Sequence, residues 1–163
     1  MAYVINENKL VLALQQGSSQ AYFKALAEEL GNYFTIKLLT YSELDMTELR
    51  SKRLYSSDES SYSTGGFKPI ETNAWTELVI EQKKAFIAHQ HSELANVFFD
   101  HELIGQLGLG SVINWPVIVH SQVIGTINLL AAEGAYLDAD LQVFEKLAPW
   151  LAIPFLLNSK CKD

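Results

Sequence analysis

The apolar residues along the chain recur at two spacings, and each spacing predicts a different kind of element. After Ser18 or Ser19, either of which can cap a helix, apolar residues recur at helical spacing up to Gly31. This pattern predicts a helix that the glycine ends. Residues 34–38 then alternate between apolar and polar side chains, which predicts a strand over residues 34–41.

A second strand is predicted for residues 50–56, and a loop follows it. Period-two alternation on this strand places Arg53 and Tyr55 on the same face. Residues 56–66 are rich in serine and glycine, which favour turns over regular structure, so they predict a long loop. Such a loop can be either a lid over a site or a solvated connection.

The clearest strand signal is a pair of β-branched runs, residues 111–120 and 122–131, which a tight turn at residues 120–122 joins into a hairpin. With this turn, the numbers of residues that face each other sum to an odd number. Asn114 and Asn128 are therefore expected on opposite faces of the hairpin. Only one of them could then point into a pocket, unless a bulge intervenes.

Short elements and a final helix complete the pattern. Asn73 and Asp100 are each placed to cap a short helix, and a brief strand is expected at residues 85–88. A last helix is expected to begin near Asp138. Pro149 is expected to break or bend it, because proline lacks an N–H and clashes with the preceding turn. This order of elements predicts an α+β fold with an antiparallel sheet.

The composition is that of one domain, residues 1–163, with a core over about residues 18–158. Of the 163 residues, 48% are hydrophobic and 19% are charged, which is enough apolar material for a single core. The net charge is −7, and no lysine or arginine occurs between Lys84 and Lys146. Without a broad basic surface, neither nucleic acid nor an anionic membrane is expected as a partner.

The one cysteine, Cys161, lies near the C-terminus and is interpreted as an inert thiol. A disulfide framework and a cysteine-based zinc site are therefore not expected. The N-terminus lacks the charged and apolar regions of a signal peptide, and the apolar run at residues 147–157 is too short to span a bilayer. We expect a cytoplasmic location, with no cofactor and no metal.

The predicted hairpin carries the residues by which the chain resembles the GAF domain family. Its first run contains Trp115-Pro116-Val117, its second contains the sequence Ile-Gly-Thr-Ile-Asn-Leu at residues 124–129, and Tyr136 and a terminal helix follow. The resemblance covers about residues 18–158. It implies a central antiparallel sheet with N- and C-terminal helices on one face. It also implies short helices and a long loop on the other face, with a small-molecule pocket beneath them.

The known GAF subclasses fit this sequence poorly. Cyclic-nucleotide-binding members carry Asn-Lys after the second hairpin strand, where this chain has Ala131-Ala132. Bilin attachment through a pocket cysteine, and reduction of free methionine sulfoxide, both need cysteines within the domain. Here the cysteine lies beyond the terminal helix. No catalytic residue is therefore assigned.

The resemblance implies that aromatic and polar residues from several elements surround the pocket. Asparagine amides both donate and accept, so they suit a carbonyl, amide or hydroxyl group of a ligand. Arg53 or Lys68 would be the partner of a carboxylate. The expected ligand-binding residues are Tyr55, Lys68, Trp75, Phe98, Asp100, His101, Asn114 and Asn128.

We expect a sensory or regulatory module that binds a small metabolite, anionic or aromatic in character, and signals to a separate protein. Two alternatives remain open. One is a small-substrate enzyme that uses His101, Asp100 or His89 as acid or base, which requires a histidine that faces a cavity and reaches a carboxylate. The other is a structural dimerisation module with a closed core. His89 and His91 would share a strand face and could form a metal pair, although a polar loop rim is the favoured interpretation.

Apolar segments near both ends of the chain predict a homodimer. Residues 147–157 are apolar nearly all round, whereas a surface helix buries only one stripe, and residues 10–14 add a second apolar run. A monomer rarely exposes such a patch, so a two-fold dimer through the N- and C-terminal segments is expected. The alternative is that residues 10–14 fold back over the segment bent at Pro149 within one chain.

Overall fold

The computed structural model describes residues 4–160, which form two compact units. The first unit contains residues 4–34 and 140–160, and the second contains residues 35–139. Cys161 lies outside the described residues, so the interpretation of its thiol stays a prediction. Within the described range, no helix is both long and apolar enough to cross a membrane.

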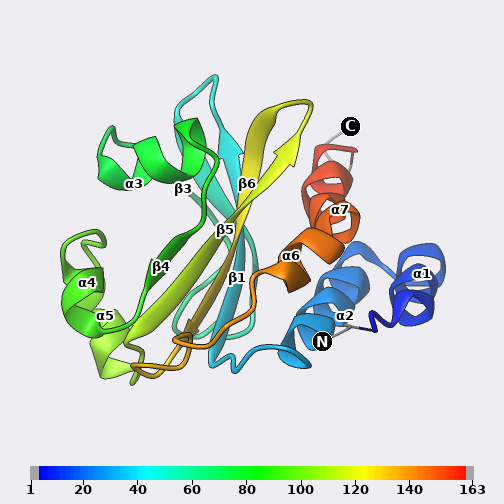
Figure 1. Ribbon diagram of the computed structural model, residues 1–163. Coiled ribbons are helices and arrows are strands. Elements are labelled where there is room, and N and C mark those ends of the chain that lie inside the picture. Colours follow the sequence, from blue (N-terminus) through cyan, green and yellow to red (C-terminus); the bar gives the residue numbers. More distant parts are fainter. Residues whose placement is uncertain (1–3, 161–163) are drawn as a thin grey trace. The chain divides into compact units, whose positions relative to one another are not determined.

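The first unit is helical and contains the segments from both ends of the described chain (Figure 1). Helix α1 packs against α2, and α2 packs against α7. The serine cap predicted for α2 is confirmed, because the Ser18 hydroxyl accepts a hydrogen bond from the Ala21 N–H at 3.1 Å. The helices of this unit are α1 (Glu7–Gln16), α2 (Ser19–Gly31), α6 (Gln142–Lys146) and α7 (Ala148–Lys160).

The predicted break in the last helix is confirmed. The segment divides into α6 and α7, and Pro149 lies in the first turn of α7, where a missing N–H costs little. Pro154 lies further inside α7 and leaves the Trp150 carbonyl without its usual donor four residues on. The Tyr22 hydroxyl donates to this carbonyl at 2.8 Å, so α2 supplies the hydrogen bond that the proline removes. Burial raises the pKa of Tyr22, which keeps this donor protonated.

The second unit is built on a six-stranded sheet, counted over the described residues, in the order β3-β2-β1-β6-β5-β4. Every neighbouring pair of strands is antiparallel, which confirms the predicted α+β class. The strands are β1 (Leu38–Asp45), β2 (Arg50–Ser56), β3 (Gly65–Pro69), β4 (Phe86–Ala88), β5 (Ser111–Val119) and β6 (Gln122–Ala131).

Short helical segments lie over one face of this sheet (Figure 1). They are α3 (Ala74–Thr76), the π-helical turn η1 (Glu77–Glu81), α4 (His91–Ala95) and α5 (His101–Gln106). Asn73 caps α3 as predicted, in a reciprocal capping box with Thr76. Asp100 precedes α5 as predicted, but its side chain makes no capping hydrogen bond, so the capping role expected for it is wrong.

The boundaries of two strands differ from the prediction. Strand β1 begins at Leu38 instead of residue 34, because Phe34 belongs to the first unit, where its ring stacks on that of Phe144 at 4.9 Å. Strand β3 was not predicted. All of its residues are exposed, so no alternation marks it in the sequence.

A bulge in the β5–β6 hairpin overturns the predicted register. The tight turn is confirmed, and His120 and Ser121 adopt positive φ angles of 51° and 63° at its centre. Beyond it, the register shifts between Val117 and Ile118, so Ile124 on β6 has no partner on β5. Asn114 and Asn128 are therefore direct cross-strand partners on the same face, and the expectation that they lie on opposite faces is wrong.

A second bulge lies in β2. Tyr55 pairs with Tyr41 of β1, but Arg53 pairs with the next residue of β1, Ser42, so Leu54 is the extra residue. Arg53 and Tyr55 consequently lie on opposite faces, and the prediction that they share one is wrong. The Tyr55 ring stacks on the Tyr41 ring at 4.9 Å, on the face away from the short helices.

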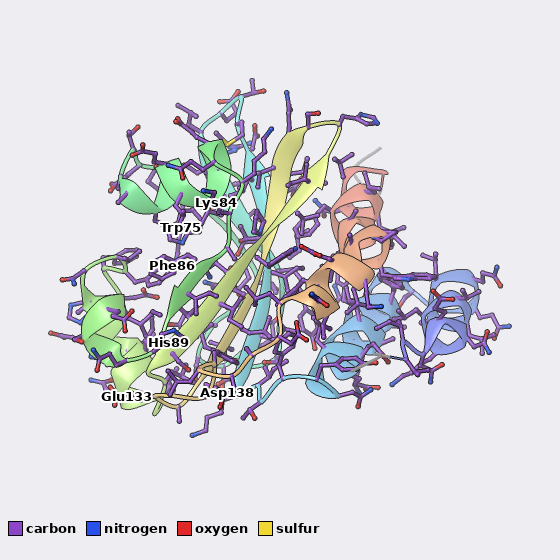
Figure 2. All side chains as sticks on the ribbon, in the orientation of Figure 1. Trp75, Lys84, Phe86, His89, Glu133 and Asp138 are labelled. Carbon is purple, nitrogen blue, oxygen red and sulfur yellow. The ribbon has the colours of Figure 1, made fainter. Side chains whose placement is uncertain are left out.

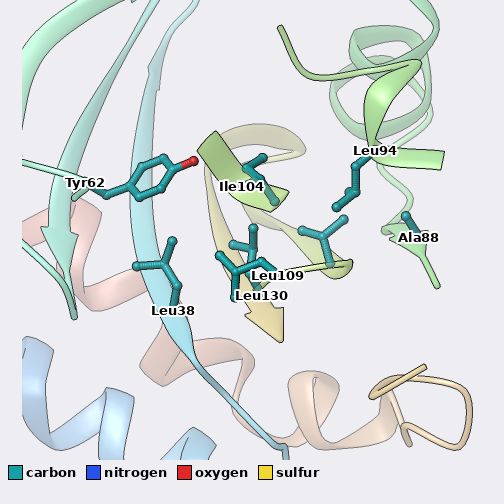
Figure 3. Packing of buried hydrophobic residues seen from close by; sticks show 8 residues of the cluster. Leu38, Tyr62, Ala88, Leu94, Ile104, Leu109 and Leu130 are labelled. Carbon is teal, nitrogen blue, oxygen red and sulfur yellow. The ribbon is translucent and has the colours of Figure 1, made fainter. Parts of the chain in front are cut away.

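One end of the helix-covered face is closed by a hydrophobic cluster (Figure 3). Leu38, Val112 and Leu130 lie in register on three neighbouring strands and contribute its base. Tyr62 enters from the β2–β3 loop, and Ile104 enters from α5. The remaining members are Ala88, Leu94 and Leu109, with Phe86, Phe98 and Leu107 packed against them.

The Tyr22 hydrogen bond is expected to stabilise the first unit only because Pro154 leaves a carbonyl free. Tyr22→Phe should lower the free energy of unfolding by about 1 kcal/mol, measured by urea denaturation. In a Pro154→Ala background, the new backbone N–H can donate to the Trp150 carbonyl, so Tyr22→Phe should cost clearly less. An equal cost in both backgrounds would contradict this account.

Candidate functional site

A cavity of about 540 Å³ lies in the second unit between the sheet and its short helices. This volume is typical of a site for a small organic ligand. Its floor is the helix-covered face of β1, β6 and β5, and Figure 2 shows Trp75 and Phe86 in the region between α3 and α4 beside that face. Residues that line the cavity include Thr40, Ser42, Arg53, Tyr62, Lys68, Trp75, Phe98, Asp100, Val112, Asn114, Thr126, Asn128 and Leu130.

Six of the eight residues expected to bind a ligand line this cavity: Lys68, Trp75, Phe98, Asp100, Asn114 and Asn128. Tyr55 is absent from the lining, because the bulge in β2 turns it to the opposite face. His101 is also absent, and its backbone carbonyl lies 2.7 Å from His91 Nε2. A role for any of the eight in binding stays a prediction.

Five side chains in the floor and wall form a continuous chain of hydrogen bonds. Trp75 Nε1 donates to Asn114 Oδ1 at 2.9 Å, and Asn114 Nδ2 donates to Asn128 Oδ1 at 2.8 Å. Asn128 Nδ2 then donates to Thr40 Oγ1 at 3.1 Å and to Ser42 Oγ at 3.2 Å. We call these five residues the polar strip; it crosses the sheet from β5 through β6 to β1.

The indole of Trp75 sets the direction of the polar strip. An indole N–H can only donate, so Asn114 must present its oxygen to Trp75 and its amide nitrogen to Asn128. The same constraint passes to Asn128, which accepts through its oxygen and donates toward Thr40 and Ser42. All the donors therefore point the same way, and the strip ends in two hydroxyl groups.

The central residues of the strip are almost fully removed from solvent, whereas Trp75 and Ser42 at its ends are partly buried. Asn114, Asn128 and Thr40 expose only 4%, 9% and 5% of their surface. A buried amide is costly unless it is hydrogen-bonded, and here each amide is satisfied by a neighbour in the strip. Within the described residues, the Thr40 and Ser42 hydroxyls accept from Asn128 but have no acceptor for their own protons. Those protons are available to donate hydrogen bonds to a ligand in the cavity.

Thr40, Ser42 and Tyr62 were not among the predicted site residues. Thr40 and Ser42 alternate with Leu39 and Tyr41 along β1, so they share one face of that strand. This alternation of hydroxyl and apolar residues was the available signal. Tyr62 belongs to the serine-rich loop, and only its aromatic ring distinguished it from its polar neighbours.

Tyr62 and Asp100 connect the β2–β3 loop to the segment before α5. The Tyr62 hydroxyl donates to Asp100 Oδ2 at 3.0 Å, and Figure 3 shows that hydroxyl pointing toward the helix that carries Ile104. Burial, and then the charge of Asp100, raise the pKa of Tyr62 and keep it protonated as the donor. Asp100 thus accepts from the loop instead of capping its own helix.

Arg53 lies beside this pair on β2. Its guanidinium carbon is 4.9 Å from the centre of the Tyr62 ring, and Nη1 donates to the Ser63 carbonyl at 3.0 Å. Its Nε is buried and has no hydrogen-bond partner in the described part of the chain. Burial lowers the pKa of Arg53, and the nearby Tyr62, Asp100 and Glu59 oppose that shift, so the side chain stays charged.

The histidines lie apart from the cavity. His89 follows β4 and His91 begins α4, so they do not share a strand face as the metal-pair hypothesis required. Residues 4–160 contain no group of three or more His, Cys, Asp or Glu side chains placed to hold a metal ion. The enzyme hypothesis required a histidine facing a cavity, and the described cavity wall contains Asp100 but no histidine.

Solved structures share this fold at low sequence identity. The GAF domain of a two-component sensor histidine kinase from Bacillus halodurans is 15% identical, with a TM-score of 0.68 over 90% of this chain and 99% of that one. The GAF domain of an Acinetobacter phosphoenolpyruvate-protein phosphotransferase is 11% identical, with a TM-score of 0.68 over 96% and 91%. The phycoerythrobilin-bound GAF domain of a cyanobacterial phytochrome is also 11% identical, with a TM-score of 0.68 over 96% and 95%.

The family comparison agrees with these matches. No curated protein matches the chain. The family model for the GAF domain matches residues 14–154, which include the whole sheet and every residue of the polar strip. The chain therefore belongs to the GAF domain family.

Proposed function

We propose that this protein is a regulatory module that binds a small organic molecule in the cavity over the polar strip. GAF domains are typically small-molecule-binding regulatory modules. The observation that supports this role here is the strip itself, a directed set of buried polar groups that ends in free hydroxyl protons under a cavity. A closed structural core would be more stable with apolar residues at these positions.

Ligand binding also offers a route to a signal. Tyr62 and Asp100 belong to two segments that both line the cavity, and they are joined to each other by one hydrogen bond. A ligand that contacts either segment would shift the β2–β3 loop relative to the segment before α5, or would hold these two segments in one relative position. We propose that a separate protein or a second subunit reads this change.

The first prediction of this proposal is a ligand that stabilises the fold. A metabolite screen by thermal denaturation should yield a compound that raises the melting temperature, because it binds only the native state. Trp75→Phe removes the donor that directs the polar strip, and it should weaken binding of that compound by about 2- to 10-fold.

The matched control is Trp115→Phe, since Trp115 is on β5 but does not line the cavity. It should leave the affinity unchanged. The proposal fails if no compound in a broad screen stabilises the protein, or if the two tryptophan variants affect binding equally.

We also propose a homodimer through the N- and C-terminal helices. Leu12 and Leu14 of α1 are 51% and 37% exposed, and Leu156 of α7 is 46% exposed, whereas Leu10 and Phe155 are buried. Exposed leucines on both terminal helices support an interface with a second copy. Helix α1 packs against α2. The competing account is that residues 10–14 fold back over the terminal segment and cover these leucines within one chain.

Sedimentation at micromolar concentration distinguishes the two accounts. The wild type should sediment as a dimer, and Leu156→Glu should dissociate it without unfolding it. Leu137→Glu is the control, because Leu137 is 66% exposed and belongs to the other unit. A wild-type species of 18.3 kDa would rule out the dimer.

A further inference from the structure

We propose that the cavity selects an organic monocarboxylic acid with a planar apolar body. The carboxylate lies against Arg53 and the hydroxyls of Thr40 and Ser42, and the apolar body lies toward Trp75 and Phe98. This inference rests on the proposed function, since it names the ligand class of the same cavity.

The direction of the polar strip places its donors at the β1 end. Asn128 uses both of its amide hydrogens on Thr40 and Ser42, so these two hydroxyls are left to donate their own protons. Two adjacent hydroxyl donors suit a group with two acceptor oxygens. The aligned side-chain dipoles also direct the positive end of the strip toward the same place, which favours a negative group there.

Arg53 adds a full positive charge on β2, the strand next to the one that carries these hydroxyls. Arg53 is the cross-strand partner of Ser42 and lines the cavity. Its Nη1 donates to the Ser63 carbonyl, and its buried Nε has no partner within the described residues. A carboxylate can accept from a guanidinium and a hydroxyl at the same time, and such charge-assisted hydrogen bonds are among the strongest that proteins use.

The other charges around the cavity limit the ligand to about one negative charge. Two cations line it, Arg53 and Lys68, and so do two carboxylates, Glu71 and Asp100. The Lys68 ammonium lies 5.3 Å from the centre of the Phe99 ring, and Asp100 accepts from Tyr62. A di- or triphosphate would carry more negative charge than this balanced set neutralises, whereas a single carboxylate needs only Arg53.

The opposite end of the strip suits the apolar part of the ligand. Trp75 lies over Asn114, and Phe98, Val112 and Leu130 line the cavity nearby. From Arg53 on β2 to Asn114 on β5, the cavity floor extends over three strand spacings, or about 14 Å. That span accommodates an aromatic ring with a short acid side chain, because the ring can pack on the indole while the acid reaches β1.

The test compares acids with their neutral amides. Binding of phenylacetate and indoleacetate, and of the corresponding primary amides, is measured by calorimetry at low ionic strength. Each acid should bind at least about tenfold more tightly than its amide, since a hydrogen bond to a charged group contributes more than a neutral one. Arg53→Gln should remove this preference by weakening the acids about 10- to 100-fold, with little change for the amides.

Arg50→Gln is the matched control on the same strand. Arg50 lies 3.8 Å over the Phe67 ring and does not line the cavity, so its loss should leave the preference for acids intact. Ser42→Ala provides a second test that keeps the arginine, and it should weaken the acids by about 2- to 10-fold. Urea denaturation of each variant confirms that it is folded before its affinity is compared.

The outcomes separate this inference from the proposed function. If the amides bind as tightly as the acids, or if Arg53→Gln and Arg50→Gln have equal effects, the acid class is wrong and the binding module stands. If neither acids nor amides bind while the metabolite screen yields another ligand, the acid class is again overturned. If the screen also yields no ligand, both the acid class and the proposed binding function are wrong.

Discussion

The hydrogen bond between Asn114 and Asn128 is the interaction on which the candidate site depends. It joins the indole on one side of the cavity to the hydroxyl groups on the other, and it does so only because the two asparagines are direct partners across β5 and β6. Burial of either amide alone would be costly, because the Asn114 amide nitrogen and the Asn128 amide oxygen satisfy each other. Side-chain chemistry and strand register therefore constrain each other at the centre of the sheet.

Much of the fold could be predicted from the sequence, because its signals are local. The Ser18 cap, the capping box at Asn73 and the break near Pro149 each depend on a few neighbouring residues with well-defined backbone preferences. Strand β3 was missed because both of its faces are exposed, so burial imposes no pattern on it. Helix α1 was noted as an apolar run, but its helical character was not predicted.

The parts of the site that could not be predicted depend on the two bulges. Ile124 and Leu54 are ordinary residues for a strand, and nothing in their chemistry marks them as the extra residue of a bulge. Alternation alone therefore assigned the wrong face to residues beyond each bulge, which separated Asn114 from Asn128 and placed Tyr55 with Arg53. Asp100 shows a different limit: its position before a helix was correct, but a tyrosine distant in sequence competes for its carboxylate.

The bulge at Ile124 also bears on how the lining of such a cavity can change during evolution. The face that a strand residue presents depends on the number of residues between it and the turn, so an insertion or deletion of one codon exchanges the two faces along the affected part of a strand. Loss of Ile124 would restore an unbroken ladder from the turn onward. Asn114 and Asn128 would still be partners in that ladder, so the cavity floor would be kept, and the bulge decides only which face the residues between it and the turn present. Length variation near the tip of a hairpin can therefore leave a binding surface further along its strands intact, because a bulge accommodates the extra residue.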